Sequence, residues 1–235
     1  MPDRRDMCLG HTHALSGLLA GTAVGLYLTH LPPARLALFA GITAGAAVLP
    51  DIDHPESSLA HSFGFLTKAV AWLVGRISGG HRHLTHAVLG VAGFTELARL
   101  AVSHRRDTAG AVGLGVLLAV ILASGLYAMR VTGHGADVLA IGGAAAMVVT
   151  GTGLTLVAVA VGVGCSVHVI GDMLTEEGCP LLFPLSGYRF RLLPGPLAFT
   201  TGTFPELWVL DPALLAGLGL LIYRGISTGA IPVRL

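Results

Sequence analysis

Histidine and aspartate residues gather in four short clusters of this 235-residue chain, and their chemistry stands out from the rest of the sequence. The chain holds 11 histidines against 14 lysines and arginines together. The clusters are His11-Thr12-His13, Pro50-Asp51-Ile52-Asp53-His54, His81-Arg82-His83-Leu84-Thr85-His86, and the pair His168 and Asp172. Imidazole and carboxylate groups together are ligands of zinc, manganese and non-haem iron. The clusters therefore indicate a site for a divalent metal ion.

The number of candidate ligands exceeds what one tetrahedral ion needs. The predicted metal ligands are His11, Asp51, Asp53, His54, His81, His86, His168 and Asp172. We expect one or two ions, zinc or manganese, with carboxylates such as Asp51 or Asp53 bridging or anchoring them. His168 and Asp172 are four residues apart, so both project from one face of a helix. Taken singly, each cluster is also consistent with interfacial histidines, a capped turn or a buried polar pair.

The elements that carry these clusters are predicted to be membrane helices. The sequence is 53% hydrophobic and only 11% charged, with a mean hydropathy of +0.76, whereas soluble domains have about 25% charged residues. Disorder, coiled coil and collagen are excluded by the apolar content and the lack of heptads or a Gly-X-Y period. We predict an all-α fold, a polytopic integral membrane helical bundle of about six or seven transmembrane helices, forming one domain over residues 1–235.

The apolar segments place the polar clusters on one face of the membrane. The expected spans are residues 14–31, 34–49, 84–103, 109–129 and 207–223, and residues 138–171 divided at Gly151-Thr152-Gly153. Residues 63–77 are short and contain Lys68 and Arg76, which is typical of an interfacial or re-entrant helix. Counting crossings brings all four clusters to the same side. Lysines and arginines favour the cytoplasm for that side, although Arg105-Arg106 lies opposite.

Several function classes lack their sequence features. A net charge of +1 gives no reason to expect a nucleic-acid partner. The three cysteines, Cys8, Cys165 and Cys179, lack metal-site spacing and are expected to be small buried side chains. His-Glu-x-x-His, a P-loop and Gly-x-Ser-x-Gly are all absent. Metalloprotease, nucleotide-driven and serine-hydrolase chemistry are therefore disfavoured.

Arginines near the clusters point to an anionic substrate. Arg82 lies inside a histidine motif and suits bidentate binding of phosphate or carboxylate. Arg189 and Arg191 are two residues apart and could bind the same ligand, although they could equally contact lipid headgroups. Asp53 or Glu176 is the expected proton acceptor. Metal and arginine at a membrane surface together predict hydrolysis of a phosphoester of a lipid or amphiphile.

The motifs resemble, in order, those of the YdjM/YbcI-type family of inner-membrane metal-dependent hydrolases. The matching elements are His11, Pro50-Asp51-Ile52-Asp53-His54, His81-Arg82-x-x-Thr85-His86, His168-x-x-x-Asp172-x-x-Thr175-x-x-Gly178, Tyr188-Arg189-Phe190-Arg191 and Thr201-Gly202-Thr203-Phe204-Pro205-Glu206. His83 stands where the family usually has Gly, and Ala87 where it often has Ser, so a hydroxyl role at Ala87 is in doubt. The resemblance implies a metal-dependent hydrolase of the bacterial inner membrane. Membrane lipids are its expected partners and candidate substrates, and no obligate protein partner is inferred.

The same ligands are compatible with two other functions. A divalent metal-ion transporter or membrane metal-binding protein would use them near the bilayer midplane, with a path to both faces. A structural metal site would be closed, with no open coordination position. A hydrolase predicts ligands clustered at one face beside a substrate cleft, so the placement of the ligands distinguishes these functions.

Overall fold

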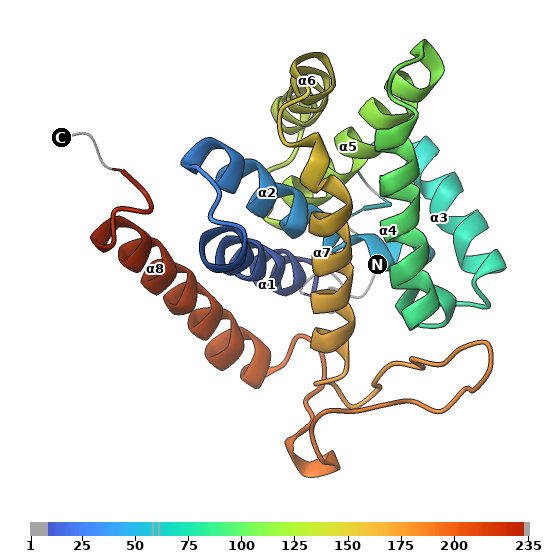
Figure 1. The fold of residues 1–235 in the computed structure, drawn as a ribbon. Coiled ribbons are helices and arrows are strands. Elements are labelled where there is room, and N and C mark those ends of the chain that lie inside the picture. Colours follow the sequence, from blue (N-terminus) through green and yellow to red (C-terminus); the bar gives the residue numbers. More distant parts are fainter. Residues whose placement is uncertain (1–8, 58, 61, 233–235) are drawn as a thin grey trace.

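The computed structural model describes residues 9–57, 59–60 and 62–232, and this part of the chain is a bundle of α-helices (Figure 1). The helices are α1 (Leu9–Ala23), α2 (Pro33–Ala46), α3 (Phe65–Ile77), α4 (Val88–Ser103), α5 (Thr108–Ala128), α6 (His134–Thr150), α7 (Val157–Asp172) and α8 (Asp211–Ser227). Three short helices matter for the site: η2 (Leu49–Asp53), η3 (Leu84–His86) and η6 (Pro205–Leu210). Among the described residues the only β structure is two isolated bridges. The all-α prediction is therefore confirmed.

Four helical stretches are long and apolar enough to cross a membrane. They are Pro33–Asp53, Thr108–Ala128, Leu154–Asp172 and Pro205–Ser227. The predicted count of six or seven spans is not confirmed within the described ranges, because α4 and α6 have 16 and 17 residues and a span needs about 20. The predicted break between α6 and α7 is present, with Gly151 and Gly153 at φ of +70° and +75°. Glycine adopts this left-handed conformation without strain.

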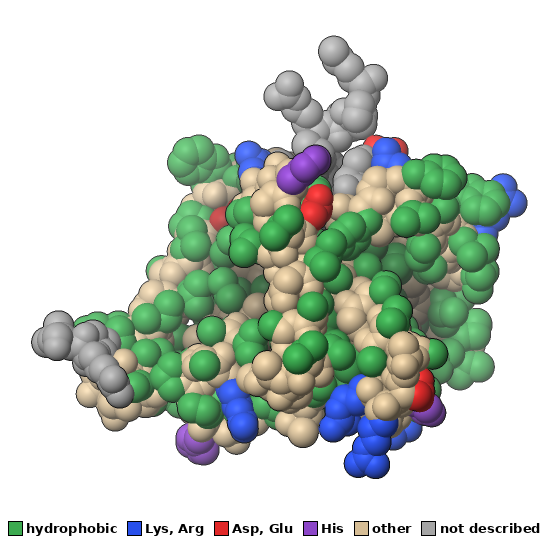
Figure 2. Space-filling view, turned by 90° about the horizontal axis from the view of Figure 1, so that it is seen from above, with side chains coloured by type: hydrophobic (Ala, Val, Ile, Leu, Met, Phe, Trp, Pro, Cys, Tyr) green, Lys and Arg blue, Asp and Glu red, His purple; other side chains and the backbone are tan. Residues whose placement is uncertain are grey.

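The outer surface matches a protein embedded in a bilayer. Figure 2 shows hydrophobic side chains across the middle of one face, with charged and histidine side chains toward its upper and lower edges. Such a band is what an apolar hydrocarbon layer between two polar interfaces requires. The stretch that contains α8 is largely exposed on the bundle surface, whereas the stretch that contains α2 is mostly buried inside it.

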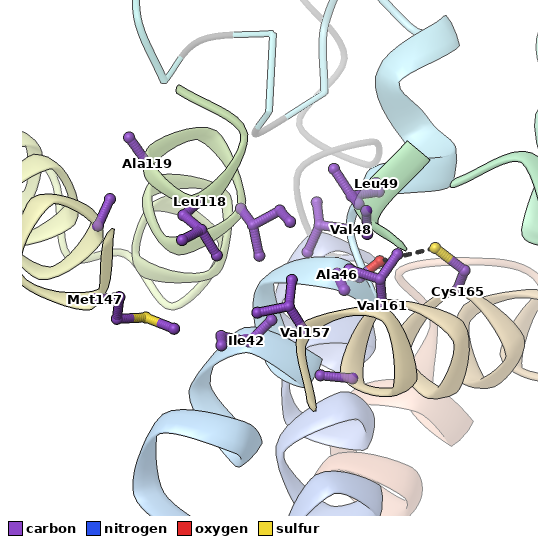
Figure 3. Packing of buried hydrophobic residues seen from close by; sticks show 14 of the residues in the cluster. Ile42, Ala46, Val48, Leu49, Leu118, Ala119, Met147, Val157, Val161 and Cys165 are labelled. Atoms are coloured by element: carbon purple, nitrogen blue, oxygen red, sulfur yellow. Dashed lines mark hydrogen bonds between the residues drawn. The ribbon is translucent and has the colours of Figure 1, made fainter. Parts of the chain in front are cut away.

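Helix α2 is the centre of the packing, with α1, α5 and α7 around it. Its Ile42 and Ala46 lie in one buried cluster with Leu118 of α5 and Val161 of α7 (Figure 3). Cys165 of α7 donates a long hydrogen bond of 3.5 Å to the carbonyl of Ala46. The predicted buried, structural role of this cysteine fits its position in the core.

Small residues allow α1 to approach α2 very closely. A Cβ atom at Gly17 would lie 2.7 Å from the Ala47 side chain, and one at Gly21 would lie 2.8 Å from the Thr43 side chain. Because the loop between the two helices is short, they run antiparallel, and the start of α1 lies beside the end of α2. This packing brings the first and second polar clusters together.

Helix α3 has the character of an interfacial helix. It is 13 residues long, with Phe65, Trp72 and Ile77 exposed, and Arg76 lies over the Trp72 ring at 4.8 Å. It packs on η2 so closely that a Cβ atom at Gly75 would lie 2.6 Å from the backbone oxygen of Asp53. Thirteen residues are too few to cross the hydrocarbon core, as predicted for residues 63–77.

The crossing of α2 and α5 provides a stability test at Gly45. A Cβ atom there would lie 1.9 Å from the backbone oxygen of Ile121, whereas one at Gly41 in the same helix would meet nothing within 4 Å. We expect Gly45→Ala to lower the free energy of unfolding by about 1–3 kcal/mol or more through overpacking. Gly41→Ala should be neutral or stabilise by about 0.5–1 kcal/mol. Thermal unfolding in detergent measures both, and equal melting temperatures would contradict the packing described here.

Candidate metal centre

The polar clusters meet where four helix ends converge. His13 lies near the start of α1, Asp51 lies in η2 just after α2, and His86 ends η3 just before α4. His168 and Asp172 lie in the last turns of α7. The structure therefore brings together residues from all four clusters at one end of the bundle.

Four ligand-type atoms form the centre of this cluster. The Nε2 atoms of His86 and His168 are 3.0 Å apart. Oδ1 of Asp51 lies 3.5 Å and 3.6 Å from these two nitrogens, and Oδ2 of Asp172 lies 3.3 Å and 3.5 Å from them. Bonds of about 2.0–2.1 Å in a tetrahedral zinc site separate ligand atoms by about 3.3 Å. These five separations are compatible with the four atoms being ligands of one ion.

The hydrogen bonds of both histidines direct an unprotonated nitrogen inward. His168 Nδ1 is 2.7 Å from the backbone oxygen of Ala47, so Nδ1 carries the proton. His86 Nδ1 is 2.9 Å from the Thr85 hydroxyl, whose own proton goes to Oδ2 of Asp53. His86 Nδ1 must then be the donor to Thr85. In the neutral rings, the two facing Nε2 atoms carry lone pairs, which is the form that binds metal.

Asp53 supports this arrangement from behind. Its side chain is fully buried, and it accepts hydrogen bonds from His81 Nδ1 at 2.8 Å and from the Arg82 backbone N–H at 3.2 Å, besides the Thr85 hydroxyl. These donors occupy both carboxylate oxygens. Asp53 therefore orients His86 through Thr85, in the way that outer carboxylates orient metal-binding histidines.

Arg82 fixes the position of Asp172. Its Nη2 donates to Asp172 Oδ1 at 2.8 Å, and its Nη1 lies 3.2 Å from the Thr175 hydroxyl and 3.3 Å from Glu177. With Oδ1 held in this way, Oδ2 faces the two histidines. Arg82 is buried and has a φ of +56°, a conformation that costs a non-glycine residue about 1–3 kcal/mol. Strain of this kind is typical of functional sites.

His13 is a candidate ligand that the sequence analysis did not select. Its ring stacks on that of His168 at 3.9 Å, and its buried Nε2 lies 3.4 Å from Asp172 Oδ1, with no hydrogen-bond partner in the described structure. A signal was present, because His13, Gly17 and Gly21 are spaced by four residues and share one helix face. That glycine face is the one that packs on α2.

The candidate ligands form three overlapping trios. These are His13 with His168 and Asp172, Asp51 with His86 and His168, and Asp51 with Asp53 and His81. Within each trio the ligand atoms lie within 4.8 Å of one another. Because Asp51 and His168 are shared between trios, the cluster is continuous and fits the expectation of one or two ions.

The histidines differ in their ionisation. Burial lowers the pKa of His86, although the nearby carboxylates of Asp51 and Asp172 oppose this. His81 is partly exposed; burial acts to lower its pKa, but the hydrogen bond to Asp53 and the charges of Asp51 and Asp53 outweigh it, so its pKa is raised. The inner histidine therefore favours the neutral form that can bind a metal ion, and the outer one favours the protonated form.

Four of the predicted ligands lie outside the central four atoms: Asp53 and His81, as described above, and His11 and His54. His11 Nε2 is 2.6 Å from Oδ2 of Asp211 in α8, so this histidine pairs with the C-terminal helix. His54 packs edge-on against His81 at 4.8 Å, and its Nδ1 accepts from the Glu56 backbone N–H at 3.3 Å. His11 and His13, both at the start of α1, point in different directions because residues two apart in a helix do not share a face.

The remaining predicted residues lie on the segment between α7 and α8. Glu176 is exposed and accepts a hydrogen bond from the Thr200 hydroxyl at 3.0 Å. Arg189 Nη1 lies 3.5 Å from the backbone oxygen of Gly178, and Arg191 is exposed. Cys179, beside Asp172, has a pKa raised by burial.

A second buried polar cluster connects the region where α8 begins to α1. The Thr12 hydroxyl lies 2.7 Å from Oε1 of Glu206 and 2.9 Å from Oδ1 of Asp211. Oε2 of Glu206 accepts from the Gly202 backbone N–H at 2.6 Å. Since Thr12 precedes His13, this cluster also holds the start of α1 in place next to the candidate metal ligands.

Thr12→Val tests that connection. The change keeps the side-chain shape but removes the hydroxyl from Oε1 of Glu206 and Oδ1 of Asp211, so we expect a loss of about 1–3 kcal/mol of stability. Thr22→Val is the matched control, because Thr22 is equally buried in α1 and only donates to the Leu18 carbonyl of its own helix. Melting temperatures in detergent compare the two. If both variants melted alike, the contact of Thr12 with the C-terminal helix would not be stabilising.

Comparison with known proteins agrees with the sequence motifs and the apolar helices. Uncharacterized protein YvsG of Bacillus subtilis (strain 168) is 26% identical over 207 residues, which cover 88% of this chain and 90% of that protein. No solved structure matches significantly. The sequence profile of the YdjM inner membrane protein family matches residues 7–227. The chain is thus an integral inner-membrane protein, and it belongs to the YdjM inner membrane protein family.

Proposed function

We propose that this protein is a membrane-bound metal-dependent hydrolase that acts on a phosphoester of a lipid or another amphiphile. The observation that carries the proposal is the pair of facing Nε2 atoms, 3.0 Å apart, of His86 and His168. Two lone pairs at this distance repel each other unless a cation lies with them. The carboxylates of Asp51 and Asp172 beside them make a divalent ion, zinc or manganese, the best-fitting cation.

The cluster has an open side, as a catalytic site requires. The side chains of His86, His168 and Asp172 are 0–1% exposed, whereas that of Asp51 is 16% exposed. His81, 37% exposed, lies on the same side beside Asp53. In this proposal, water and substrate approach the centre past Asp51 and His81, its more exposed residues. A bound divalent ion would supply hydroxide near neutral pH by lowering the pKa of its water.

The surrounding contacts support distinct roles for the predicted catalytic residues. Arg82 positions Asp172, and Asp53 positions His86 through Thr85. Asp53 also contacts His81 at the open side, which keeps it a candidate for accepting a proton through that imidazole. The contact of Glu176 with Thr200 gives less support to the same role.

A phosphoester is favoured by the arginines. The Nε atom of Arg82 is buried without a hydrogen-bond partner in the described part of the chain. Arg189 and Arg191 lie on the segment that follows Asp172. Within this segment, Cys179 and Phe190 form two backbone hydrogen bonds, of 2.8 Å and 3.1 Å. Guanidinium groups bind phosphate oxygens in a bidentate way. This segment is therefore the proposed contact for the anionic group.

The position of the ligands favours hydrolysis over ion transport. They lie at the ends of α2 and α7 and in the loop before α4, and not in the middle of the spanning helices. A transporter places its ligands near the bilayer midplane, where both faces can be reached.

The first test is the metal content of protein purified from membranes. We expect about stoichiometric divalent metal in the wild type and loss of it in Asp51→Ala and His168→Ala. His134→Ala is the control, because His134 is an exposed residue at the start of α6. Elemental analysis gives the content. Chelation should also lower the melting temperature of the wild type and of His134→Ala, since a ligand that binds only the folded state stabilises it.

Two results would contradict the metal site. The first is wild-type protein that contains no stoichiometric metal. The two facing histidines would then share a proton in place of a metal ion. A chelator that lowered the melting temperature of a folded His168→Ala variant as much as that of the wild type would place the metal elsewhere.

The second test is turnover of phosphoesters presented in lipid vesicles. We expect the metal-loaded wild type to release phosphate or a phosphorylated headgroup. His168→Ala should be slower by more than about 100-fold, since loss of even an outer partner of a metal ligand costs about 10–100-fold. His134→Ala should match the wild type. Metal-loaded protein that turned over no ester would favour the transporter.

A further inference from the structure

A large apolar cavity lies beside the candidate metal centre. Its volume is about 960 Å³, and it is lined by residues from η2, α3, α4, α5, α6 and α7. Two of its lining residues, Leu49 and Ile52, belong to η2, the same short helix that carries Asp51 and Asp53. The cavity therefore borders the short helix that presents a proposed metal ligand, although none of the central four residues lines it. Ligand pockets commonly measure about 300–1,000 Å³.

From η2 the cavity extends along the inner part of the bundle, and on α4 its lining begins at Phe94. On α4 its lining residues include Phe94, Leu97, Ala101 and His104, which follow one helix face over ten residues. At 1.5 Å per residue this face is about 15 Å long. Helix α4 begins next to His86, so the cavity leads away from the metal centre toward the opposite end of the bundle.

The lining and the mouth of the cavity define what can enter. Leu66 of α3 and Val112 and Val116 of α5 line it and are also 71%, 61% and 59% exposed, so it opens on the outer apolar surface of the bundle. An apolar cavity is a poor site for water. In an integral membrane protein, the surroundings of that surface are lipid hydrocarbon.

We propose that this cavity holds an acyl chain of the phosphoester substrate, with the phosphoester at the open side of the metal centre near Asp51. The inference rests on the proposed hydrolase function and identifies the substrate as a membrane lipid. An acyl chain that moves from the bilayer into the cavity exchanges one apolar environment for another. The cavity therefore adds little to the binding affinity for the lipid, and mainly positions the scissile bond. Correct placement of that bond has large effects on rate.

Glycine positions in two spanning helices give a matched test. Gly113 of α5 lines the cavity, and a Cβ atom there would meet nothing within 4 Å. Gly219 of α8 likewise has nothing within 4 Å of a Cβ atom, but it lies away from the cavity. Gly113→Phe adds a large side chain at the cavity lining, at a position where its Cβ atom meets no neighbour, and Gly219→Phe makes the same change on an outer helix. Neither residue belongs to the metal centre.

The experiment compares hydrolysis of a dipalmitoyl phospholipid with that of a phosphomonoester carrying a short alkyl chain, using full-length protein in nanodiscs. We expect Gly113→Phe to lower the long-chain to short-chain rate ratio at least about tenfold, with short-chain turnover unchanged. Gly219→Phe should keep the wild-type ratio. Lipid that remains bound after delipidation, measured by native mass spectrometry, should also fall in Gly113→Phe alone.

The remaining outcomes overturn one proposal or the other. An unchanged rate ratio together with reduced lipid binding would make the occupant a bystander bilayer lipid, and would overturn the substrate assignment. Unchanged lipid binding and an unchanged ratio would overturn the cavity as an acyl site. If the wild type hydrolysed neither substrate, the hydrolase proposal would fail, and the substrate assignment that rests on it would fail too. Lipid binding would then still show separately whether the cavity accepts an acyl chain.

Discussion

Two imidazole nitrogens that face each other between the carboxylates of Asp51 and Asp172 are the constraint on which the site depends. The Nε2 atoms of His86 and His168 point at one another only because their Nδ1 atoms have other acceptors, the Thr85 hydroxyl and the Ala47 carbonyl. Arg82 in turn holds Asp172 so that one oxygen faces the pair. Without these hydrogen bonds, the Nδ1 atoms and the Asp172 oxygen would be buried polar atoms that lack a partner. Such atoms are costly in a low-dielectric interior.

The packing of α2 makes this constraint possible. Its end supplies the Ala47 carbonyl, and the following η2 supplies Asp51, so any shift of α2 would move an acceptor of His168 and a proposed ligand together. Close contacts at Gly17 and Gly45 hold it against α1 and α5. In lipid, where helices gain little from the hydrophobic effect, close contact between small residues is a main source of such precision.

The membrane surroundings explain why a polar site and an apolar cavity occur together in this protein. The candidate ligands lie at the ends of helices, while the apolar cavity borders η2 and extends along α4 from Phe94 to His104. A polar headgroup and its hydrocarbon chain need these two environments side by side. The segment between α7 and α8 follows Asp172 and contains Glu206, which accepts a hydrogen bond from Thr12 at the start of α1.

The sequence by itself determined the class of protein and the approximate location of the site. Its apolar composition, the glycine break at 151–153 and the spacing of His168 and Asp172 are local properties that predict helices and their faces. Only the tertiary structure decided which atoms face one another: His13 lies beside His168, while His11 pairs with Asp211, and Asp53 lies behind His86. The predicted count of six or seven spans is not confirmed, because only four helical stretches in the described part of the chain are long and apolar enough to cross a membrane. Residue type and helical period are local properties of the sequence. Whether a residue is a candidate ligand or only positions one depends on contacts between segments far apart in sequence.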